Sequence, residues 1–284
     1  MISNRPPPPR VEAYQYVELR QSSGVQFEGE VEDAERLRPF ELGAHFERGG
    51  FIDSLYAPTA RRSEEWRDGY IREQLPTLPL RMNGDQINPS EFWIALATFQ
   101  GEPEEALRSN LGLDRVTFGL VVTTLLDHDL INRLEFWRDT DDDVRSPLIY
   151  IRDSGLWHRF YEVIRDPAGR GPNVRLEGKA WEAFNVEALR GTVGSRAQPY
   201  VWRRDNVGEI DLVLDWASGV RWGIEISRSP TKRPTRGFHL GCDALGCERR
   251  MVICPIGEDS HGGSTETMRL DDALVEISRG PDEC

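Results

Sequence analysis

The chain has 284 residues, a net charge of −13 at neutral pH and four cysteines. This length is enough for two ordinary domains, and the cysteines are too few for a disulfide scaffold. No apolar run approaches the roughly 18 residues of a membrane span, and the first residues lack the apolar core of a signal peptide. We therefore expect a cytoplasmic protein, and its acidity confines any nucleic-acid contact to a local basic patch.

The first 62 residues contain little regular patterning. Residues 1–27 include a proline run and predict a flexible leader. Residues 28–62 are short, loop-rich pieces that indicate the stub of a larger module. The chain then becomes helical over residues 63–152. Ser63 is placed to cap the first of these helices, which carries an apolar stripe at Trp66, Tyr70 and Ile71.

A winged-helix pattern occupies the rest of this helical segment. Helices are predicted for 90–101, 102–110 and from Asp114 onward, followed by strand-like pieces at 130–137 and 148–152. In a DNA-binding winged helix, Arg115 and Thr117 would lie near the start of the helix that contacts DNA. The alternative is a packing or dimerisation module. That alternative is favoured by four acidic residues at the tip between the two strands, which would repel phosphate: Asp139, Asp141, Asp142 and Asp143.

Residues 153–284 predict a compact domain with a mixed sheet. A connector is followed by an amphipathic helix over 178–190, a strand over 199–203, a hairpin, a helix ending near Leu245 and a strand over 249–256. The predicted fold class is therefore α/β (α+β): a helical winged-helix module, then a mixed sheet flanked by helices.

The hairpin of this domain is the most informative local feature. Segments 209–216 and 220–227 each alternate apolar and polar residues, and Ala217-Ser218-Gly219 suits a three-residue loop with a left-handed glycine. Paired residue numbers then sum to 436, so Asp211 faces Glu225. Facing Cβ atoms lie about 5 Å apart, close enough for two carboxylates to share one Mg²⁺ ion.

The residues around this pair resemble a nuclease site. Asp-x(n)-Glu-x-Lys is the core of the PD-(D/E)XK nuclease fold, and Ser227 occupies the lysine position. Glu182 could supply an acid from the preceding helix. Lys179, on the same helix face as Glu182, could replace the lost lysine, whereas Arg228 is a weaker candidate. We expect a degenerate site that is inactive or weakly active; the alternatives are an active nuclease using Lys179 and a polar cluster with a structural role.

A zinc site formed by His239, Cys242, Cys247 and Cys254 is a further alternative. The spacings between these residues are irregular, and Cys254 falls in a strand-like segment. This pattern favours buried small side chains over zinc.

Taken together, these stretches resemble the C-terminal region, of unknown function, of bacterial AAA-type ATP-binding proteins. The resemblance covers about residues 37–278 and depends on the order of several short motifs: Gly49-Gly-Phe51, Trp66 to Ile71, Asn110 to Leu113, Pro147 to Leu156, Gly178 to Glu182, Glu209 to Asp211 and Gly223 to Ser227. It implies a winged helix followed by a nuclease-like domain.

The resemblance also bears on cofactors and partners. The chain contains no Gly-x4-Gly-Lys-Ser/Thr motif, so we expect no ATP binding. Our leading hypothesis is a nucleic-acid-linked or protein-interaction module, with DNA, RNA or a second copy of the chain as candidate partners. The two alternatives are an active Mg²⁺-dependent nuclease that uses Lys179 and a regulatory partner of a separate AAA-type ATPase.

Overall fold

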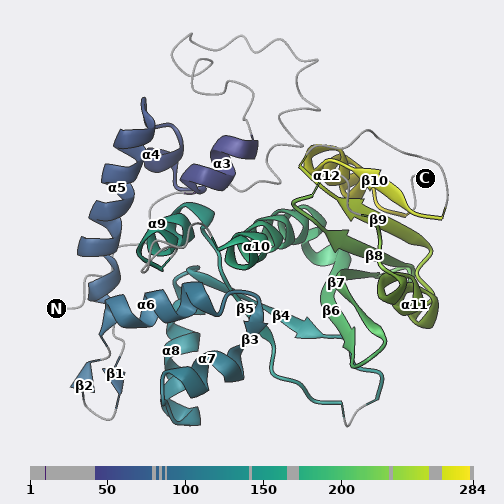
Figure 1. Ribbon diagram of the computed structural model, residues 1–284, viewed down its shortest axis with the longest axis horizontal. Helices are drawn as coiled ribbons and strands as arrows, with labels where there is room; N and C mark the ends of the chain where they lie inside the picture. Colours follow the sequence, from purple (N-terminus) through teal and green to yellow (C-terminus); the bar gives the residue numbers. More distant parts are fainter. Residues whose placement is uncertain are drawn as a thin grey trace. The chain divides into compact units, whose positions relative to one another are not determined.

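The computed structural model describes residues 10, 42–78, 81–82, 85–86, 88–140, 143–164, 173–229, 233–255 and 264–281 (Figure 1). The leader predicted for residues 1–27, apart from Arg10, lies outside these ranges, as do Asp141 and Asp142. The chain forms two compact units. The first comprises Met1–Asn132 and Ile149–Phe184, and the second comprises Arg133–Leu148 and Asn185–Cys284.

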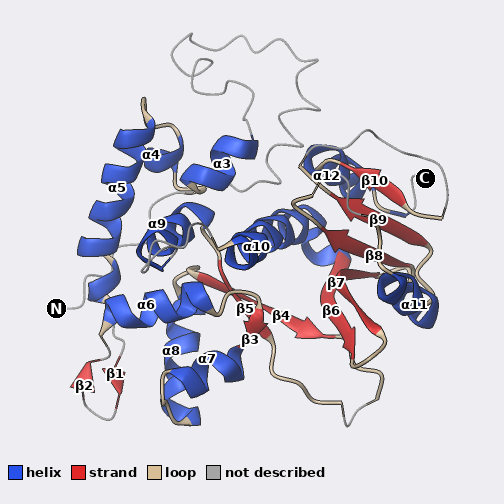
Figure 2. Cartoon of the chain, viewed as in Figure 1, coloured by secondary structure: helices blue, strands red, loops and turns tan. Residues whose placement is uncertain are grey.

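The first unit is mainly helical (Figure 2). Its helices are α3 (Leu42–Arg48), α4 (Ile52–Leu55), α5 (Ala60–Glu73), η1 (Leu75–Thr77), α6 (Pro89–Thr98), α7 (Glu104–Asn110), α8 (Arg115–Asp127), α9 (Ser154–Ile164) and the first part of α10 (Val174–Val193). Its strands are β1 (Arg81–Met82), β2 (Asp85–Gln86), β3 (Glu102–Pro103), the start of β4 (Ile131–Phe136) and most of β5 (Leu148–Ile151).

Aromatic side chains from several helices build the core of this unit. The ring of Trp93 in α6 stacks on Phe160 of α9, with centroids 5.5 Å apart and planes 6° from parallel. The indole N–H of Trp157 donates to the Ala97 carbonyl at 3.1 Å, so this buried polar group is satisfied. Residues from the predicted stub also belong to this unit, because Phe46 of α3 contacts the ring of Trp181 in α10.

Helix α5 begins earlier than the sequence indicates. Its cap is Thr59, whose side chain accepts a hydrogen bond from the Arg62 N–H, so the predicted capping role of Ser63 is wrong. Ser63 is instead buried within the helix, and its hydroxyl lies 2.8 Å from the hydroxyl of Ser54. The Ser63 hydroxyl therefore contacts α4, and no local sequence pattern predicts this contact.

The second unit is built on a mixed sheet. Its strands are the end of β4, β6 (Ala197–Arg204), β7 (Gly208–Trp216), β8 (Arg221–Ile226), β9 (Arg249–Ile253) and β10 (Glu266–Met268), in the order β10-β9-β8-β7-β6-β4. Strand β7 is antiparallel to both of its neighbours, and the remaining pairs are parallel. The unit also contains the end of α10, η2 (Gly194–Arg196), α11 (Arg236–Leu245) and α12 (Leu270–Arg279). The predicted mixed α/β class is confirmed.

The predicted hairpin register is confirmed. Leu212 pairs with Ile224 and Val213 with Gly223, both with residue numbers that sum to 436. The loop glycine, Gly219, has φ +87°. By contrast, strand β10 and helix α12 were not expected from the sequence. No helix in the described ranges combines the length and the apolar character needed to cross a bilayer.

Candidate functional site

A β-bulge in β7 lies at the position of the first candidate carboxylate. Tyr200 pairs with Val213 and Trp202 with Ile210, so two steps along β6 oppose three along β7. The extra residue lets Ile210 and Val213, three apart in sequence, pack in the same core cluster beside α11. Bulges re-aim side chains, and Asp211 lies within this one.

Asp211 is half-buried and bonds to the neighbouring strand. Its Oδ2 accepts the backbone N–H of Ile226 at 2.7 Å. Extending the observed register by one residue places Asp211 opposite Glu225. The Asp211 carboxylate therefore fixes the end of the β7–β8 ladder.

Glu225 of β8 is buried, with 5% of its surface exposed, and its side chain contacts the N-terminus of α11. Its Oε2 accepts the backbone N–H of Thr235 at 3.3 Å. Thr235 in turn caps α11, because its hydroxyl oxygen accepts the Phe238 N–H at 3.0 Å. The positive end of a helix dipole stabilises a nearby anion, so Glu225 links strand β8 to the N-terminus of α11.

Ser227, at the lysine position of the nuclease pattern, is part of the local backbone structure. It is buried, and its backbone N–H donates to the Ile253 carbonyl at 2.9 Å. Its hydroxyl oxygen accepts the Ser229 N–H at 3.1 Å. The side chain thus stabilises the turn after β8, and it can carry no positive charge.

Lys179 and Glu182 lie on the same face of α10, as their spacing predicts. Lys179 Nζ lies 3.0 Å from Glu182 Oε2. Two further residues of this cluster were not predicted from the sequence. The hydroxyl of Tyr150 donates to Glu182 Oε1 at 3.0 Å. Gly101 has φ +69°, and an added Cβ there would be 2.9 Å from Lys179 Cδ. All four residues belong to the first unit, whereas Asp211 and Glu225 belong to the second.

The described residues contain no group of three or more His, Cys, Asp or Glu side chains arranged to hold a metal ion. A Mg²⁺ ion bound between Asp211 and Glu225 would therefore take its other ligands from backbone carbonyls, water or substrate phosphate. Cys242, Cys247 and Cys254 are buried, which confirms the burial that their pattern predicted.

The start of α8 has a capping role. Thr117 is buried, and its hydroxyl donates to Asp114 Oδ2 at 2.6 Å, while Asp114 Oδ1 accepts the Val116 and Thr117 N–H groups. The hydrogen bond from the Thr117 hydroxyl and those from the backbone lower the pKa of Asp114. Arg115 is exposed. Beyond it, two apolar side chains, Val116 (74% exposed) and Leu120 (66% exposed), lie on the outer face of this helix.

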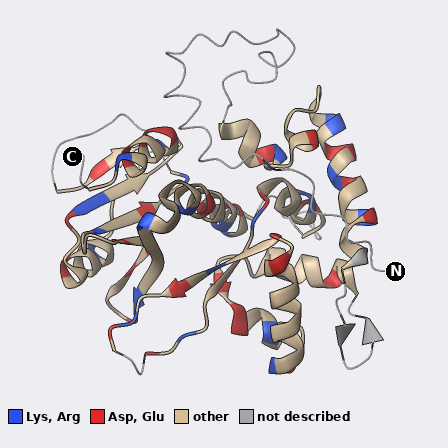
Figure 3. Cartoon of the chain, turned by 180° about the vertical axis from the view of Figure 1, so that it is seen from behind, with Lys and Arg blue, Asp and Glu red and all other residues tan. Residues whose placement is uncertain are grey.

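Asp139 and Asp143, the two described acidic residues of the tip between β4 and β5, are paired with arginines. Arg204 binds Asp139 at 2.5 Å, and Arg145 binds Asp143 at 2.8 Å and also donates to the Arg203 carbonyl. Both charge signs occur along the helices and strands of each unit (Figure 3). DNA contact through Arg115 and Thr117 stays a prediction.

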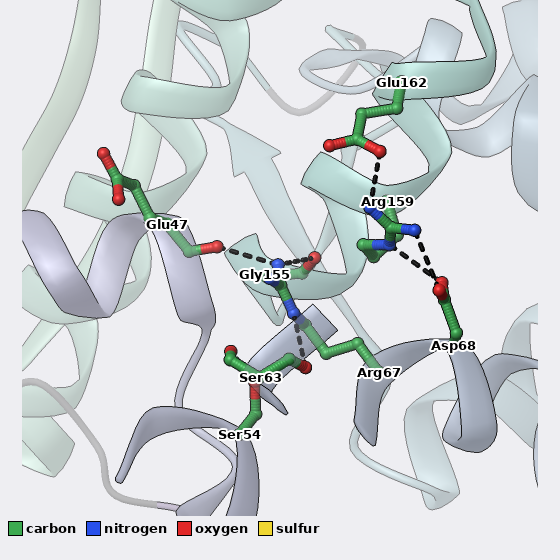
Figure 4. A network of polar contacts seen from close by, with 8 residues as sticks. All are labelled: Glu47, Ser54, Ser63, Arg67, Asp68, Gly155, Arg159 and Glu162. Atoms are coloured by element: carbon green, nitrogen blue, oxygen red, sulfur yellow. Dashed lines mark hydrogen bonds and ion pairs between the residues drawn. The ribbon is translucent and has the colours of Figure 1, made fainter. Parts of the chain in front are cut away.

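A buried polar network in the first unit joins three helices (Figure 4). The guanidinium of Arg67 in α5 donates to the carbonyls of Glu47, Ser63 and Gly155 at 2.8 to 3.3 Å. Burial lowers the pKa of Arg67. On the neighbouring turns of α5 and α9, Arg159 binds both oxygens of Asp68, at 2.8 and 2.9 Å.

Asp153 forms a second buried anchor in this unit. Its two oxygens accept the N–H groups of Leu156 and Gly50, each at 2.9 Å, and Arg10 lies 3.6 Å away. Gly49 has φ +79°, and an added Cβ there would lie 2.1 Å from Asp153 Oδ1. Three of the stretches that carry the family resemblance thus meet through these contacts, so the structure assigns them an architectural role: 49–51, 66–71 and 147–156.

A domain family of unknown function is similar to the C-terminal part of the chain. The family model "Domain of unknown function (DUF4143)" matches residues 177–271, which include Glu182, Asp211, Glu225 and Ser227. The chain is 30% identical over 216 residues to the uncharacterized proteins Rv2008c of Mycobacterium tuberculosis and Mb2031c of Mycobacterium bovis. The match covers 73% of this chain but 48% of each relative, so the chain spans about half of their length. No solved structure matches.

Proposed function

We propose that the protein is a nuclease-like module that lacks effective catalysis and acts through binding to another protein. One observation carries this proposal: the residues at the positions of a nuclease site serve the backbone. Asp211 accepts the Ile226 N–H, Glu225 accepts the Thr235 N–H, and Ser227 stabilises the turn after β8.

The chemistry of phosphodiester cleavage supports this view. A cation must offset the charge that develops on the phosphate. One well-placed group lowers the activation free energy by about 3 to 4 kcal/mol. Ser227 supplies no such charge. The exposed apolar side chains of Val116 and Leu120 on α8 favour a protein surface over phosphate as the partner.

A nuclease assay combined with calorimetry tests the proposal. We expect no Mg²⁺- or Mn²⁺-dependent cleavage of plasmid DNA, single-stranded DNA or RNA above the buffer rate, with Asp211→Asn indistinguishable from the wild type. We also expect no saturable heat when either metal is titrated into the protein. Cleavage that depends on metal and disappears in Asp211→Asn contradicts the proposal.

The alternative of an active nuclease is favoured by the Lys179–Glu182–Tyr150 contacts, which hold the lysine in a defined position. Under this alternative Lys179→Met abolishes metal-dependent cleavage. Arg175→Met, at an exposed arginine one turn earlier in α10, is the control and leaves cleavage unchanged. Equal rates in the two variants exclude Lys179 as the catalytic cation.

The resemblance to the C-terminal region of AAA-type ATP-binding proteins suggests a second candidate function, that of partner to a separate ATPase, and the length of the relatives is compatible with it. The matched region is about half of each mycobacterial protein, so the relatives carry a further part that this match does not cover. Purification of the tagged chain at native levels from its host should then recover a protein with a P-loop. Recovery of the chain without any P-loop protein counts against this role.

A further inference from the structure

The end of α11 brings two cysteines together. The helix ends with Gly246 in the left-handed conformation, with φ 63° and ψ 41°. The Cys247 N–H then donates to the Cys242 carbonyl at 2.8 Å. This is the Schellman arrangement, which places the side chains of these two positions in contact. An apolar pair usually occupies the positions, whereas here both are thiols.

The two sulfur atoms share one small space above strand β8. An added Cβ at Gly223 would lie 2.6 Å from Cys242 Sγ and 3.4 Å from Cys247 Sγ. The absence of a side chain at Gly223 therefore leaves room for both sulfur atoms. Cys242 is fully buried, and Cys247 retains 7% exposure, so Cys247 is the more accessible of the two.

The surroundings give the two thiols different acidities. A hydrogen bond from the Cys242 thiol lowers the pKa of Cys247, and the nearby charges of Arg250 and Arg221 act in the same direction. The same hydrogen bond, together with burial, raises the pKa of Cys242. Arg221 is held at this end of the helix because it donates to the Leu245 carbonyl at 3.0 Å. Cys247 is therefore the better nucleophile and Cys242 the resolving thiol.

We propose that Cys242 and Cys247 are a redox modification site that forms a reversible intramolecular disulfide with a hydroperoxide as oxidant. The Cys247 thiolate attacks the peroxide, the O–O bond breaks, an alcohol or water leaves, and Cys247 becomes a sulfenic acid. Cys242 sulfur then attacks Cys247 sulfur, the S–O bond breaks, and water leaves with the thiol proton. Two electrons pass from the thiols to the peroxide, and a dithiol reductant returns them.

The disulfide would join the last turn of α11 to the segment that enters β9. Gly223, which lies against both sulfur atoms, precedes Glu225 by two residues in β8, and α11 is the helix whose N-terminal cap binds Glu225. The cross-link would therefore fix α11, the helix whose N-terminus positions the Glu225 carboxylate. This inference does not depend on whether that carboxylate is catalytic.

Peptide mass spectrometry of the full chain tests the site directly. Trypsin releases both cysteines in one peptide, residues 237–249, because Arg236 and Arg249 flank them. After treatment of the folded protein with hydrogen peroxide and alkylation of free thiols, we expect this peptide to lose two hydrogens and to carry no alkyl group. Treatment with dithiothreitol should restore two alkylation sites.

Variants and controls separate the site from general oxidation. Cys254→Ser removes another buried cysteine and should leave the cross-link intact, whereas Cys247→Ser should abolish it. A peptide that stays reduced in folded wild-type protein, that gains oxygen atoms at either cysteine, or that pairs with Cys254 or Cys284 overturns the proposal. The wild-type result stands even if Cys247→Ser fails to fold.

Discussion

The buried carboxylates of the two units, Asp153 and Glu225, occupy similar environments. Both are almost fully buried, and both accept backbone N–H groups at the start of a helix, α9 for Asp153 and α11 for Glu225. They differ in their neighbours. Arg10 lies 3.6 Å from Asp153, whereas extending the hairpin register by one residue places a second carboxylate, Asp211, opposite Glu225. Burial and hydrogen bonding to the backbone are therefore common to both units, and the second carboxylate of the hairpin is what distinguishes Glu225 from Asp153.

The largest expected effect tests the architectural role of Asp153. Gly49→Ala places a methyl group against Asp153 and forces a left-handed backbone on a residue with a Cβ. We expect a loss of about 3 kcal/mol or more in the free energy of unfolding, because overpacking and backbone strain add. Urea denaturation followed by tryptophan fluorescence measures it.

Gly112→Ala is the matched control for this substitution. Gly112 has φ +65°, close to that of Gly49, but an added Cβ there meets no atom within 4 Å. Only the loss due to backbone strain, about 1 to 2 kcal/mol in the free energy of unfolding, should remain. Equal losses at the two positions would show that the contact with Asp153 is not what makes a glycine necessary at position 49.

His45, beside the Asp153 network, gives a pH-dependent test. Burial, and then the charge of Arg10, lowers the pKa of His45 from 6.5 to about 3. The unfolded ring binds a proton near pH 6.5, whereas the folded ring stays neutral. Stability is therefore greatest above pH 6.5 and falls as the pH drops toward 3. Between pH 8 and 5 we expect a loss of about 2 kcal/mol from this group.

His45→Leu isolates the contribution of the ring. The free energy of unfolding of this variant, measured by urea denaturation at each pH, should change by less than that of the wild type between pH 8 and 5. Carboxylates titrate mainly below this range. If the two proteins show parallel pH profiles, the ring is protonated in the folded state and the burial argument for His45 is wrong.

Local patterns made the second unit more predictable than the polar anchors of the first. The hairpin register follows from a three-residue loop and two alternating segments, all within 20 residues. The contacts of Asp153 with Gly50, or of Tyr150 with Glu182, join residues that are far apart in the chain and share no period. Sequence analysis could therefore place Glu182 on α10 but could not find its partner hydroxyl.

Helix α12 illustrates a different limit. Leu270, Ala273, Leu274 and Ile277 have the spacing of a helical apolar face, and all are buried. The segment has only 10 residues and includes several charged ones. Helices this short depend on tertiary packing for their stability. The apolar spacing is compatible with α12, but no local pattern indicates the packing that stabilises this helix.

The next test addresses the hairpin side of the comparison. Asp211→Asn and Glu225→Gln each keep an acceptor oxygen but weaken a charge-assisted hydrogen bond, so we expect each to cost about 1 kcal/mol. The double variant should cost more than the sum, because the first neutralisation also removes a repulsion between like charges. Urea denaturation of the four proteins gives the coupling free energy.

The same four proteins test for bound metal. If the two carboxylates have a structural role alone, the unfolding midpoints should not change when Mg²⁺ is added. A ligand that binds the folded state raises its stability. A midpoint that rises with Mg²⁺ in the wild type but not in Asp211→Asn would therefore show a surviving metal site and separate Glu225 from the purely architectural Asp153.

Asp114, at the exposed start of α8, extends the comparison to a carboxylate in solvent and should show the smallest effect. Hydrogen bonds from the Thr117 hydroxyl and the backbone lower its pKa below the ordinary 3.8. Its contribution to stability is therefore fully present above pH 3.8 and is lost as the pH falls through the lowered value. The gap between the wild type and Asp114→Ala in thermal midpoint should shrink in acid, whereas the gap between Asp114→Asn and Asp114→Ala should not. A wild-type gap that persists at low pH would mean that the neutral carboxyl group caps α8 as well as the anion does, and that charge adds nothing at this position.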